Sequence, residues 1–307
     1  MQRTFAWALA MLALVGLAGC SAQESDSGAV PLHVLLIPAD GGTQSGTLAD
    51  YRPIFEAVGN TAGLEFDLKV AQSYGAVVEA LCNGTADIAF VGPVTYLQAH
   101  ERGCAELLAV AVKNGQSEYF AGVFARKDSP ISSLADLRGK SVAFGDVNST
   151  SSFIFPIAML MESGLDPVKD LGPLRLTGSH ANSLAALIEG QVDAAALSFE
   201  SYEKAVREGV PGAESVRVVA RSEPIPYPPL VTNSRLPDDL SQKLRQAFEN
   251  VAQAPGIRPE MIRGYGGEQV DGYDADFPPQ RFDSAARKMA LLSDELKGEI
   301  LKKSSER

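Results

Sequence analysis

The feature that most constrains the fold is an alternation of short apolar strands with amphipathic helical segments. Residues 32–37 read as a buried strand, residues 48–58 have helical spacing of apolar side chains, and residues 64–70 read as a second strand. An alternation of this kind places consecutive strands in one sheet and helices on its faces. The pattern therefore predicts an α/β fold with mostly parallel sheets.

The alternation occurs twice along the chain, which predicts two α/β units. We expect the first unit at residues 31–118, completed by residues 230–307, and the second unit at residues 119–229. The proline-rich residues 222–229 are expected to return the chain to the first unit, and the last helix is expected at residues 282–303. Two units joined by two crossings leave a cleft between them, and ligands commonly bind in such clefts.

Residues 1–20 have the features of an export signal. Arg3 gives a positive start, residues 5–17 form an apolar stretch that is short for a membrane span, and the segment ends in Leu-Ala-Gly-Cys20. That ending resembles a bacterial lipobox, in which the cysteine is lipidated and becomes the mature N-terminus. Residues 21–30 are small and polar and are expected to be a tether. The alternative is a buried apolar helix.

The charge balance and the cysteines restrict the partners and the compartment. The chain has 38 acidic and 27 basic residues and a net charge of −11, which argues against nucleic acid as a partner. After removal of the signal, two cysteines besides Cys20 remain, Cys82 and Cys104. In an oxidising compartment a disulfide between them is one expectation. Two separately buried thiols, or a thiol that binds an ion, are the alternatives.

The motifs of common enzyme classes are missing from the sequence. No Gly-x-Ser-x-Gly elbow precedes a helix, and His33, His100 and His180 are the only histidines. No His/Cys spacing fits a zinc site, and no Walker or dinucleotide-binding glycine pattern occurs. We therefore expect no catalysis, no metal and no cofactor.

A run of three hydroxyl residues marks the candidate binding site. Ser149, Thr150 and Ser151 follow a short strand at residues 141–144 and precede a stretch with helical spacing. At a helix N-terminus several backbone N–H groups lack intrahelical partners and the helix dipole is positive, so an oxyanion can bind there without Lys or Arg. The simpler interpretation is that Asn148 or Ser149 only caps the helix.

Five short motifs occur in the order and spacing found in a known protein family. They lie at residues 83–93, 134–140, 145–151, 178–180 and 190–194. The set resembles that of the phosphonate/phosphite-binding proteins of ABC importers, and the similarity extends from about residue 32 to about residue 250. This resemblance implies the bilobal fold of type II periplasmic binding proteins, with strand hinges between the lobes.

The resemblance also implies a set of ligand-binding residues. Ser149, Thr150, Ser151 and His180 would bind the phosphonate oxygens, and Tyr74 and Tyr119 would join them. Hydroxyl, phenol, imidazole and helix N–H groups are all donors, which suits a tetrahedral oxyanion. The alternatives are a helix cap for His180 and packing roles for the two tyrosines.

Thr95 and Tyr96, on the helix after Gly92 and Pro93, would also face the cleft by this resemblance. Their alternative role is a helix cap with a packed aromatic ring.

The sequence departs from the family pattern at two places. Members that bind aminoalkyl phosphonates use two carboxylates for the amine; the first corresponds to Glu200, but the second falls at Pro228. This loss argues against an aminophosphonate ligand. The loop Gly41-Gly42-Thr43-Gln44 also lacks the usual polar pattern.

The sequence as a whole predicts a monomeric, lipid-anchored solute-binding protein on the extracytoplasmic or periplasmic side of a membrane. Its expected ligand is a small phosphorus oxyanion, such as phosphite or an alkylphosphonate, and its expected partners are the permease and ATPase of an ABC importer. One alternative is an oxyanion sensor, for example for arsenite, that signals to a membrane histidine kinase. Another is a binding protein for a sulfonate or a vitamin-like anion.

Overall fold

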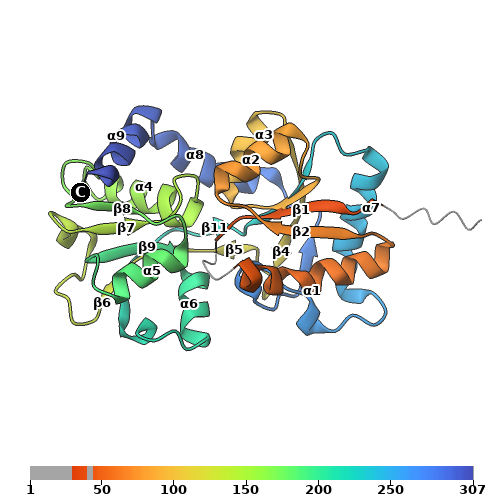
Figure 1. The fold of residues 1–307 in the computed structure, drawn as a ribbon, viewed down its shortest axis with the longest axis horizontal. Coiled ribbons are helices and arrows are strands. Elements are labelled where there is room, and N and C mark those ends of the chain that lie inside the picture. Colours follow the sequence, from red (N-terminus) through yellow and green to blue (C-terminus); the bar gives the residue numbers. More distant parts are fainter. Residues whose placement is uncertain (1–29, 40–43, 307) are drawn as a thin grey trace, which may run out of the picture. The chain divides into compact units, whose positions relative to one another are not determined.

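The strands of the computed structural model form two large sheets, one in each lobe (Figure 1). The structure describes residues 30–39 and 44–306. The predicted signal peptide with Cys20, nearly all of the predicted tether, and Gly41, Gly42 and Thr43 lie outside these residues. In the described part of the chain, no helix has the length and apolar character needed to span a bilayer.

The sheet of the first lobe has the strand order β13-β4-β12-β3-β1-β2. Its strands are β1 (Leu32–Leu36), β2 (Phe66–Val70), β3 (Ile88–Phe90), β4 (Ala105–Val112), β12 (Pro229–Asn233) and β13 (Gly272–Asp274). The strand β1 pairs in parallel with β2 and β3, whereas β12 runs antiparallel to both of its neighbours. The sheet is therefore mixed, because β12 returns from the second lobe in the opposite direction.

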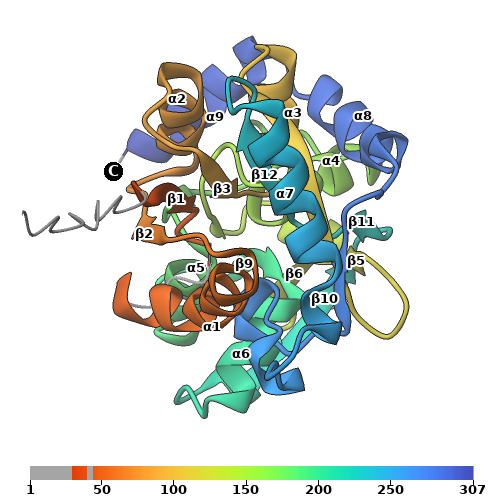
Figure 2. The ribbon, with the colours of Figure 1, turned by 90° about the vertical axis from the view of Figure 1, so that its right-hand side faces the viewer.

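Helices cover both faces of this first sheet. They are α1 (Gln44–Ala62), α2 (Tyr74–Asn83), α3 (Pro93–Glu101) and α7 (Asp238–Glu249). The helices α1 and α7 pack together on one face, and α2 and α3 pack together on the other, as Figure 2 shows. Phe55 of α1 packs edge-to-face against Phe66 and against Phe248 of α7, which fixes these elements to the sheet.

The sheet of the second lobe has the order β10-β6-β9-β7-β8. Its strands are β6 (Ala121–Arg126), β7 (Val142–Phe144), β8 (Leu174–Leu176), β9 (Ala194–Ser198) and β10 (Val216–Arg221). Its helices are α4 (Phe155–Glu162), α5 (His180–Ile188) and α6 (Phe199–Arg207). The strand β7 is parallel to β8 and β9, and the remaining pairs are antiparallel. The α/β class and the bilobal fold expected from the sequence are thus confirmed.

A small two-stranded sheet connects the lobes. The strand β5 (Glu118–Tyr119) pairs antiparallel with β11 (Ile225–Pro226). The chain leaves the first lobe through β5 and returns through β11, at the two places where the sequence predicts crossings (Figure 1). Tyr119 and Ile225 face each other in this pair and are both buried, so the hinge is part of the core.

The C-terminal segment differs from the single helix expected at residues 282–303. It forms α8 (Asp283–Leu291) and α9 (Asp294–Ser305), and Ser293 caps α9 by accepting a hydrogen bond from the N–H of Leu296. A capping serine starts a new helix rather than continuing the old one, which explains the break.

The same segment ends on the second lobe, although the sequence assigns it to the first. The ammonium of Lys303 binds the backbone oxygens of Val168 and Leu171, beside β8. The division of the chain into lobes otherwise stays a prediction. Six short 3-10 turns complete the fold: η1 (Leu134–Leu137), η3 (Ala213–Ser215), η4 (Val251–Gln253), η5 (Pro259–Met261), η6 (Tyr265–Gly267) and η7 (Pro279–Phe282).

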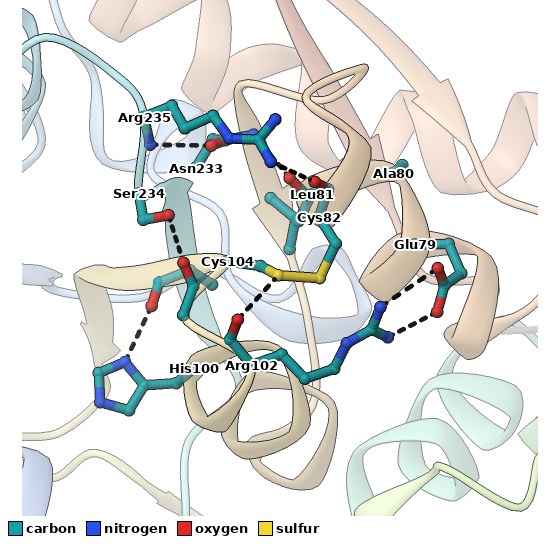
Figure 3. The surroundings of a disulfide bond; sticks show 12 residues. Glu79, Ala80, Leu81, Cys82, His100, Arg102, Cys104, Asn233, Ser234 and Arg235 are labelled. Atoms are coloured by element: carbon teal, nitrogen blue, oxygen red, sulfur yellow. Dashed lines mark hydrogen bonds and ion pairs between the residues drawn. A yellow bond between two sulfur atoms is a disulfide. The ribbon is translucent and has the colours of Figure 1, made fainter.

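A disulfide in the first lobe joins the end of a helix to the start of a strand. The sulfurs of Cys82, at the end of α2, and Cys104, just before β4, are 2.02 Å apart (Figure 3). Arg235 donates to the backbone oxygen of Cys82, and Arg102 pairs with Glu79 beside the bridge. The bond leaves neither sulfur as a free thiol.

Candidate oxyanion-binding site

The hydroxyl run lies at the start of a helix, as the sequence predicts. Ser149 is the N-cap of η2 (Thr150–Ile154), a π-helical turn that continues into α4, and its Oγ accepts a hydrogen bond from the N–H of Ser152 at 3.2 Å. The helix cap is therefore real. It does not compete with anion binding, because a hydroxyl that accepts one hydrogen bond still has its own proton to donate.

All three hydroxyl residues are buried between the lobes. The exposed fractions of Ser149, Thr150 and Ser151 are 1%, 1% and 3%. The first N–H groups of a helix have no partner within it, so this turn supplies backbone donors beside the hydroxyls. The π-helical hydrogen bonds, such as that from the N–H of Ile154 to the oxygen of Ser149 at 3.0 Å, widen the turn.

The start of α3 in the first lobe meets this turn directly. The N–H of Val94 donates to Oγ1 of Thr150 at 2.9 Å, and Oγ1 of Thr95 donates to the backbone oxygen of Asn148 at 3.2 Å. A Cβ added to Gly92 would lie 3.1 Å from Oγ1 of Thr150, so the glycine allows this close approach. Two helix N-termini from different lobes thus converge on Thr150.

Tyr74 brings a third helix start to the same region. It is the first residue of α2, is buried, and its backbone N–H donates to Oδ2 of Asp146 at 3.3 Å. Burial raises the pKa of the Asp146 carboxyl, while the N–H groups of Asn148 and Tyr74 lower it. Asp146 therefore links the hydroxyl loop to the first lobe.

His180, the first residue of α5, is held as a neutral hydrogen-bond donor. The backbone N–H of Ser198 donates a hydrogen bond to Nδ1 of His180, with the two nitrogens 2.9 Å apart. Because Nδ1 is the acceptor, the ring proton of the neutral imidazole lies on Nε2. Burial lowers the pKa of His180 to about 3, so the ring is neutral near pH 7. Its backbone N–H reaches the oxygen of Ala39 in the first lobe at 3.3 Å.

Tyr119 of the hinge strand faces the hydroxyl run. Burial raises the pKa of its phenol, and hydrogen bonding with the side chains of Ser151 and Thr150 lowers it in part. The Tyr119 ring packs edge-to-face against Tyr227 and Tyr265, with centroid distances of 6.2 and 5.8 Å. The phenol is thus a protonated donor fixed by two other aromatic rings.

Glu200 lies in the first turn of α6, with one carboxyl oxygen left without a partner within the described residues. Its Oε2 is buried and has no hydrogen-bond partner among residues 30–39 and 44–306. Burial raises the pKa of Glu200 to about 8, and the nearby charges of Glu203 and Glu268 add to this rise. The position expected for a second carboxylate is occupied by Pro228, next to the buried Tyr227.

Sequence reasoning missed Tyr265, which joins the lobes beside the site. Its hydroxyl lies 3.2 Å from Oγ of Ser198 and 3.1 Å from Oγ of Ser201, both on the second lobe. Tyr265 is an isolated aromatic residue in an irregular segment, where no periodic pattern marks it. Tyr96, by contrast, packs against Phe282 and His100, whereas its neighbours Val94 and Thr95 bond to the hydroxyl loop.

The structure therefore brings Ser149, Thr150, Ser151, Thr95, Tyr74, Tyr119 and His180 together at the meeting of the lobes. Most polar groups there are hydrogen-bond donors, namely hydroxyl, phenol, imidazole and backbone N–H groups. Such a set of donors can stabilise a bound anion without any positively charged side chain. Within the described residues, no group of three or more His, Cys, Asp or Glu side chains could hold a metal ion.

Comparison with protein-family models gives one match that covers most of the chain. Residues 42–270 match the family described as "ABC transporter, phosphonate, periplasmic substrate-binding protein".

The proteins similar to the chain include two curated relatives and one solved structure, as follows. The phosphate-import protein PhnD of Mycolicibacterium smegmatis is 27% identical over 269 residues, which cover 84% of each chain. The phosphonates-binding periplasmic protein of Escherichia coli is 25% identical and covers 72% of this chain and 67% of its own. The binding protein component of an ABC phosphonate transporter from Pseudomonas aeruginosa superposes with a TM-score of 0.73 at 24% identity, over 89% of this chain and 96% of that one.

Proposed function

The chain belongs to the family of periplasmic substrate-binding proteins of ABC phosphonate transporters, and on this premise we propose that it binds a small phosphorus oxyanion, phosphite or an alkylphosphonate, between its two lobes. The bound form is then recognised by the permease of the importer, whose ATPase drives uptake. We further propose that Cys20 carries a lipid that anchors the protein, as a monomer, to the extracytoplasmic face of a membrane.

The observation that supports the ligand class most strongly is the environment of Thr150. Its Oγ1 accepts from the N–H of Val94, so its own proton is available to an acceptor between the lobes. Ser149 has the same arrangement, since it accepts from the N–H of Ser152. Each hydroxyl is thereby oriented as a donor, and a tetrahedral oxyanion offers several lone pairs to such donors.

Donors from both lobes explain how binding is coupled to closure. Tyr74 belongs to the first lobe, whereas Ser149, Thr150 and His180 belong to the second. A ligand that contacts both sets does so only when the lobes are closed, and it therefore stabilises the closed state.

The arsenite-sensor alternative has less support. A thiol that binds arsenic must be free, but Cys82 and Cys104 are bonded to each other. The remaining cysteine, Cys20, is the proposed lipid attachment site.

A thermal-shift screen of the chain from residue 21 onward tests the proposal. The compounds are phosphite, methylphosphonate, ethylphosphonate, phosphate, sulfate and arsenite. A ligand that binds only the folded state adds about 2.7 kcal/mol of stability at a hundredfold excess over Kd. We expect a selective rise in Tm with phosphite or an alkylphosphonate, and its loss in Thr150→Ala. A rise with sulfate or arsenite alone would refute the proposed ligand class.

A further inference from the structure

The carboxylate of Asp146 forms hydrogen bonds of two different kinds. Asp146 lies in the loop at residues 145–150, which leads from β7 into the hydroxyl run. Its Oδ1 accepts a hydrogen bond from the N–H of Asn148 at 2.8 Å, which closes a turn within the loop. Its Oδ2 accepts from the N–H of Tyr74 in the first lobe at 3.3 Å. One oxygen therefore shapes the loop, and the other binds the loop to the opposite lobe.

The bond to Tyr74 places a carboxylate at the start of a helix. Tyr74 is the first residue of α2, and the first N–H groups of a helix have no acceptor within it. The first turn of α2 contains no acidic residue of its own. Asp146 supplies a negative charge there from the second lobe, and the helix dipole stabilises it. This contact forms only when the two lobes are close together.

The same loop is also bonded to α3 of the first lobe. Nε2 of Gln98 donates to Oδ1 of Asn148 at 3.0 Å, and Oγ1 of Thr95 donates to the backbone oxygen of Asn148 at 3.2 Å. The N–H of Val94 donates to Oγ1 of Thr150 at 2.9 Å. In each of these bonds, as in the bond at α2, the donor lies on the first lobe and the acceptor lies on the loop. The loop is therefore docked on both α2 and α3.

From this arrangement we propose that Asp146 is a positioning residue of the binding site: its carboxylate holds the loop on α2, the loop docks on α2 and α3 as one unit, and this docking sets the place of the hydroxyl run. Asp146 acts through the loop rather than on the ligand. The effect on affinity rests on the proposed function, whereas the docking itself does not.

The effect of docking on affinity follows from the equilibrium between open and closed lobes. The docking bonds form only in the closed arrangement, so they raise its population before a ligand arrives. The apparent Kd is the intrinsic Kd divided by the fraction of protein in the binding-competent state. Loss of a docking bond lowers this fraction. It should therefore raise the Kd of every oxyanion by the same factor and leave their order unchanged.

Two variants remove docking bonds from opposite sides. The amide in Asp146→Asn has one acceptor oxygen in place of two, so it cannot serve both the turn and α2. Gln98→Met removes the bond to Asn148 from the first lobe and leaves the residues of the loop unchanged. Asp166→Asn is the matched control, because Oδ1 of Asp166 accepts from the N–H of Val168 at 2.9 Å in a turn of the same kind that stays within the second lobe.

Amide hydrogen exchange, measured by NMR on the ligand-free protein, tests the docking. We expect the amides of Tyr74 and Val94 to be protected in the wild-type protein. They should exchange about tenfold faster in Asp146→Asn and about threefold faster in Gln98→Met, and keep the wild-type rates in Asp166→Asn. The bond between Gln98 and Asn148 involves neither amide, so faster exchange at Tyr74 in Gln98→Met would show that the loop docks as one unit.

Calorimetric titration with phosphite and with methylphosphonate tests the consequence for binding. Asp146→Asn is expected to raise both Kd values about tenfold and Gln98→Met about threefold, while Asp166→Asn keeps the wild-type values. Wild-type exchange at Tyr74 in both variants, unchanged Kd values in Asp146→Asn, or a loss confined to one ligand overturns the inference and leaves the proposed function standing. If the wild-type protein binds neither ligand, the proposed function fails, and the exchange rates still decide whether Asp146 holds the loop on α2.

Discussion

At the scale of single residues, the binding capacity of the site depends on which donor and acceptor atoms already form hydrogen bonds within the protein. The hydroxyls of Ser149 and Thr150 accept from backbone N–H groups and His180 accepts through Nδ1, so each has a proton left to donate. The hydroxyl run and His180 could be found in the sequence because they stand in a local pattern. The role of Tyr265 could not, because it reaches Ser198 and Ser201 only through the tertiary fold.

Thr150→Ala should weaken binding of the phosphorus oxyanion by about 1 to 3 kcal/mol, because it removes a donor to a charged acceptor. Thr150→Ser keeps the hydroxyl and should restore most of the affinity in calorimetric titrations. Thr61→Ala serves as a matched control, since the hydroxyl of Thr61 binds only backbone oxygens of α1. Equal affinities of Thr150→Ala and the wild-type protein would exclude Thr150 from the site.

Glu200→Gln should change the pH dependence of stability. The folded protein holds the Glu200 proton up to a pKa of about 8, whereas the unfolded chain releases it near 4.5. The unfolded state then binds fewer protons between these values, so the free energy of unfolding falls as the pH rises through this window.

The glutamine variant lacks this loss of stability. It should match the wild-type protein near pH 4.5 and exceed it by about 1 to 3 kcal/mol at pH 8.5, measured by urea unfolding. The exposed Glu214→Gln is the control on the same lobe. If the difference in the free energy of unfolding between Glu200→Gln and the wild-type protein stayed constant over this pH range, it would contradict the buried, protonated carboxyl.

At the scale of elements, the alternation of strands and helices was predictable because each strand is apolar and each helix has a periodic apolar face. The strands β5, β11 and β13 were not predicted, because each contains polar residues, glycine or proline, unlike the equally short but wholly apolar β3 and β7. The break between α8 and α9 was also missed, although Ser293 is a cap signal at the right place. The packing of α9 on the second lobe depends on long-range contacts that no local pattern contains.

The disulfide is the element-scale feature with the clearest energetic effect. Cys82 and Cys104 are 22 residues apart, and closing a loop of this length restricts the unfolded chain by about 3 kcal/mol. The double variant Cys82→Ser, Cys104→Ser should therefore lose about this much stability in denaturant unfolding. Its ligand affinity should be unchanged, because the bridge lies at the end of α2 opposite Tyr74.

Reduction of the wild-type protein gives an independent check on the disulfide. A reductant should lower its stability toward that of the double variant and leave the double variant itself unaffected. Equal stability of the oxidised wild-type protein and the double variant would show that the bridge does not contribute.

At the scale of the whole molecule, the closed arrangement is held by contacts that do not need the ligand. An ion pair joins Lys204 of α6 to Asp50 of α1, and the side chains are only 11% and 19% exposed. It acts together with the contacts of Tyr265 and Thr95 across the cleft. Such contacts bias the equilibrium between open and closed states, and this bias sets the apparent affinity for every ligand.

Asp50→Asn should consequently raise the Kd of all ligands by a similar factor, about three- to tenfold, without changing their order. Small-angle scattering of the ligand-free variant should show a larger radius of gyration than that of the wild-type protein. Asp294→Asn is the control, because Asp294 is fully exposed and its pair with Lys297 lies within α9. A change in ligand preference instead of a uniform loss would show that Asp50 contacts the ligand.

The most direct test of the central claim is phosphorus NMR of methylphosphonate titrated with the protein. The account predicts a saturable shift or broadening of the phosphorus signal with the wild-type protein, reversal by phosphite, and little effect with Thr150→Ala at the same concentration. A phosphorus signal that does not change with the wild-type protein, or that changes equally with Thr150→Ala, would contradict a phosphorus oxyanion bound by the hydroxyl run between the lobes.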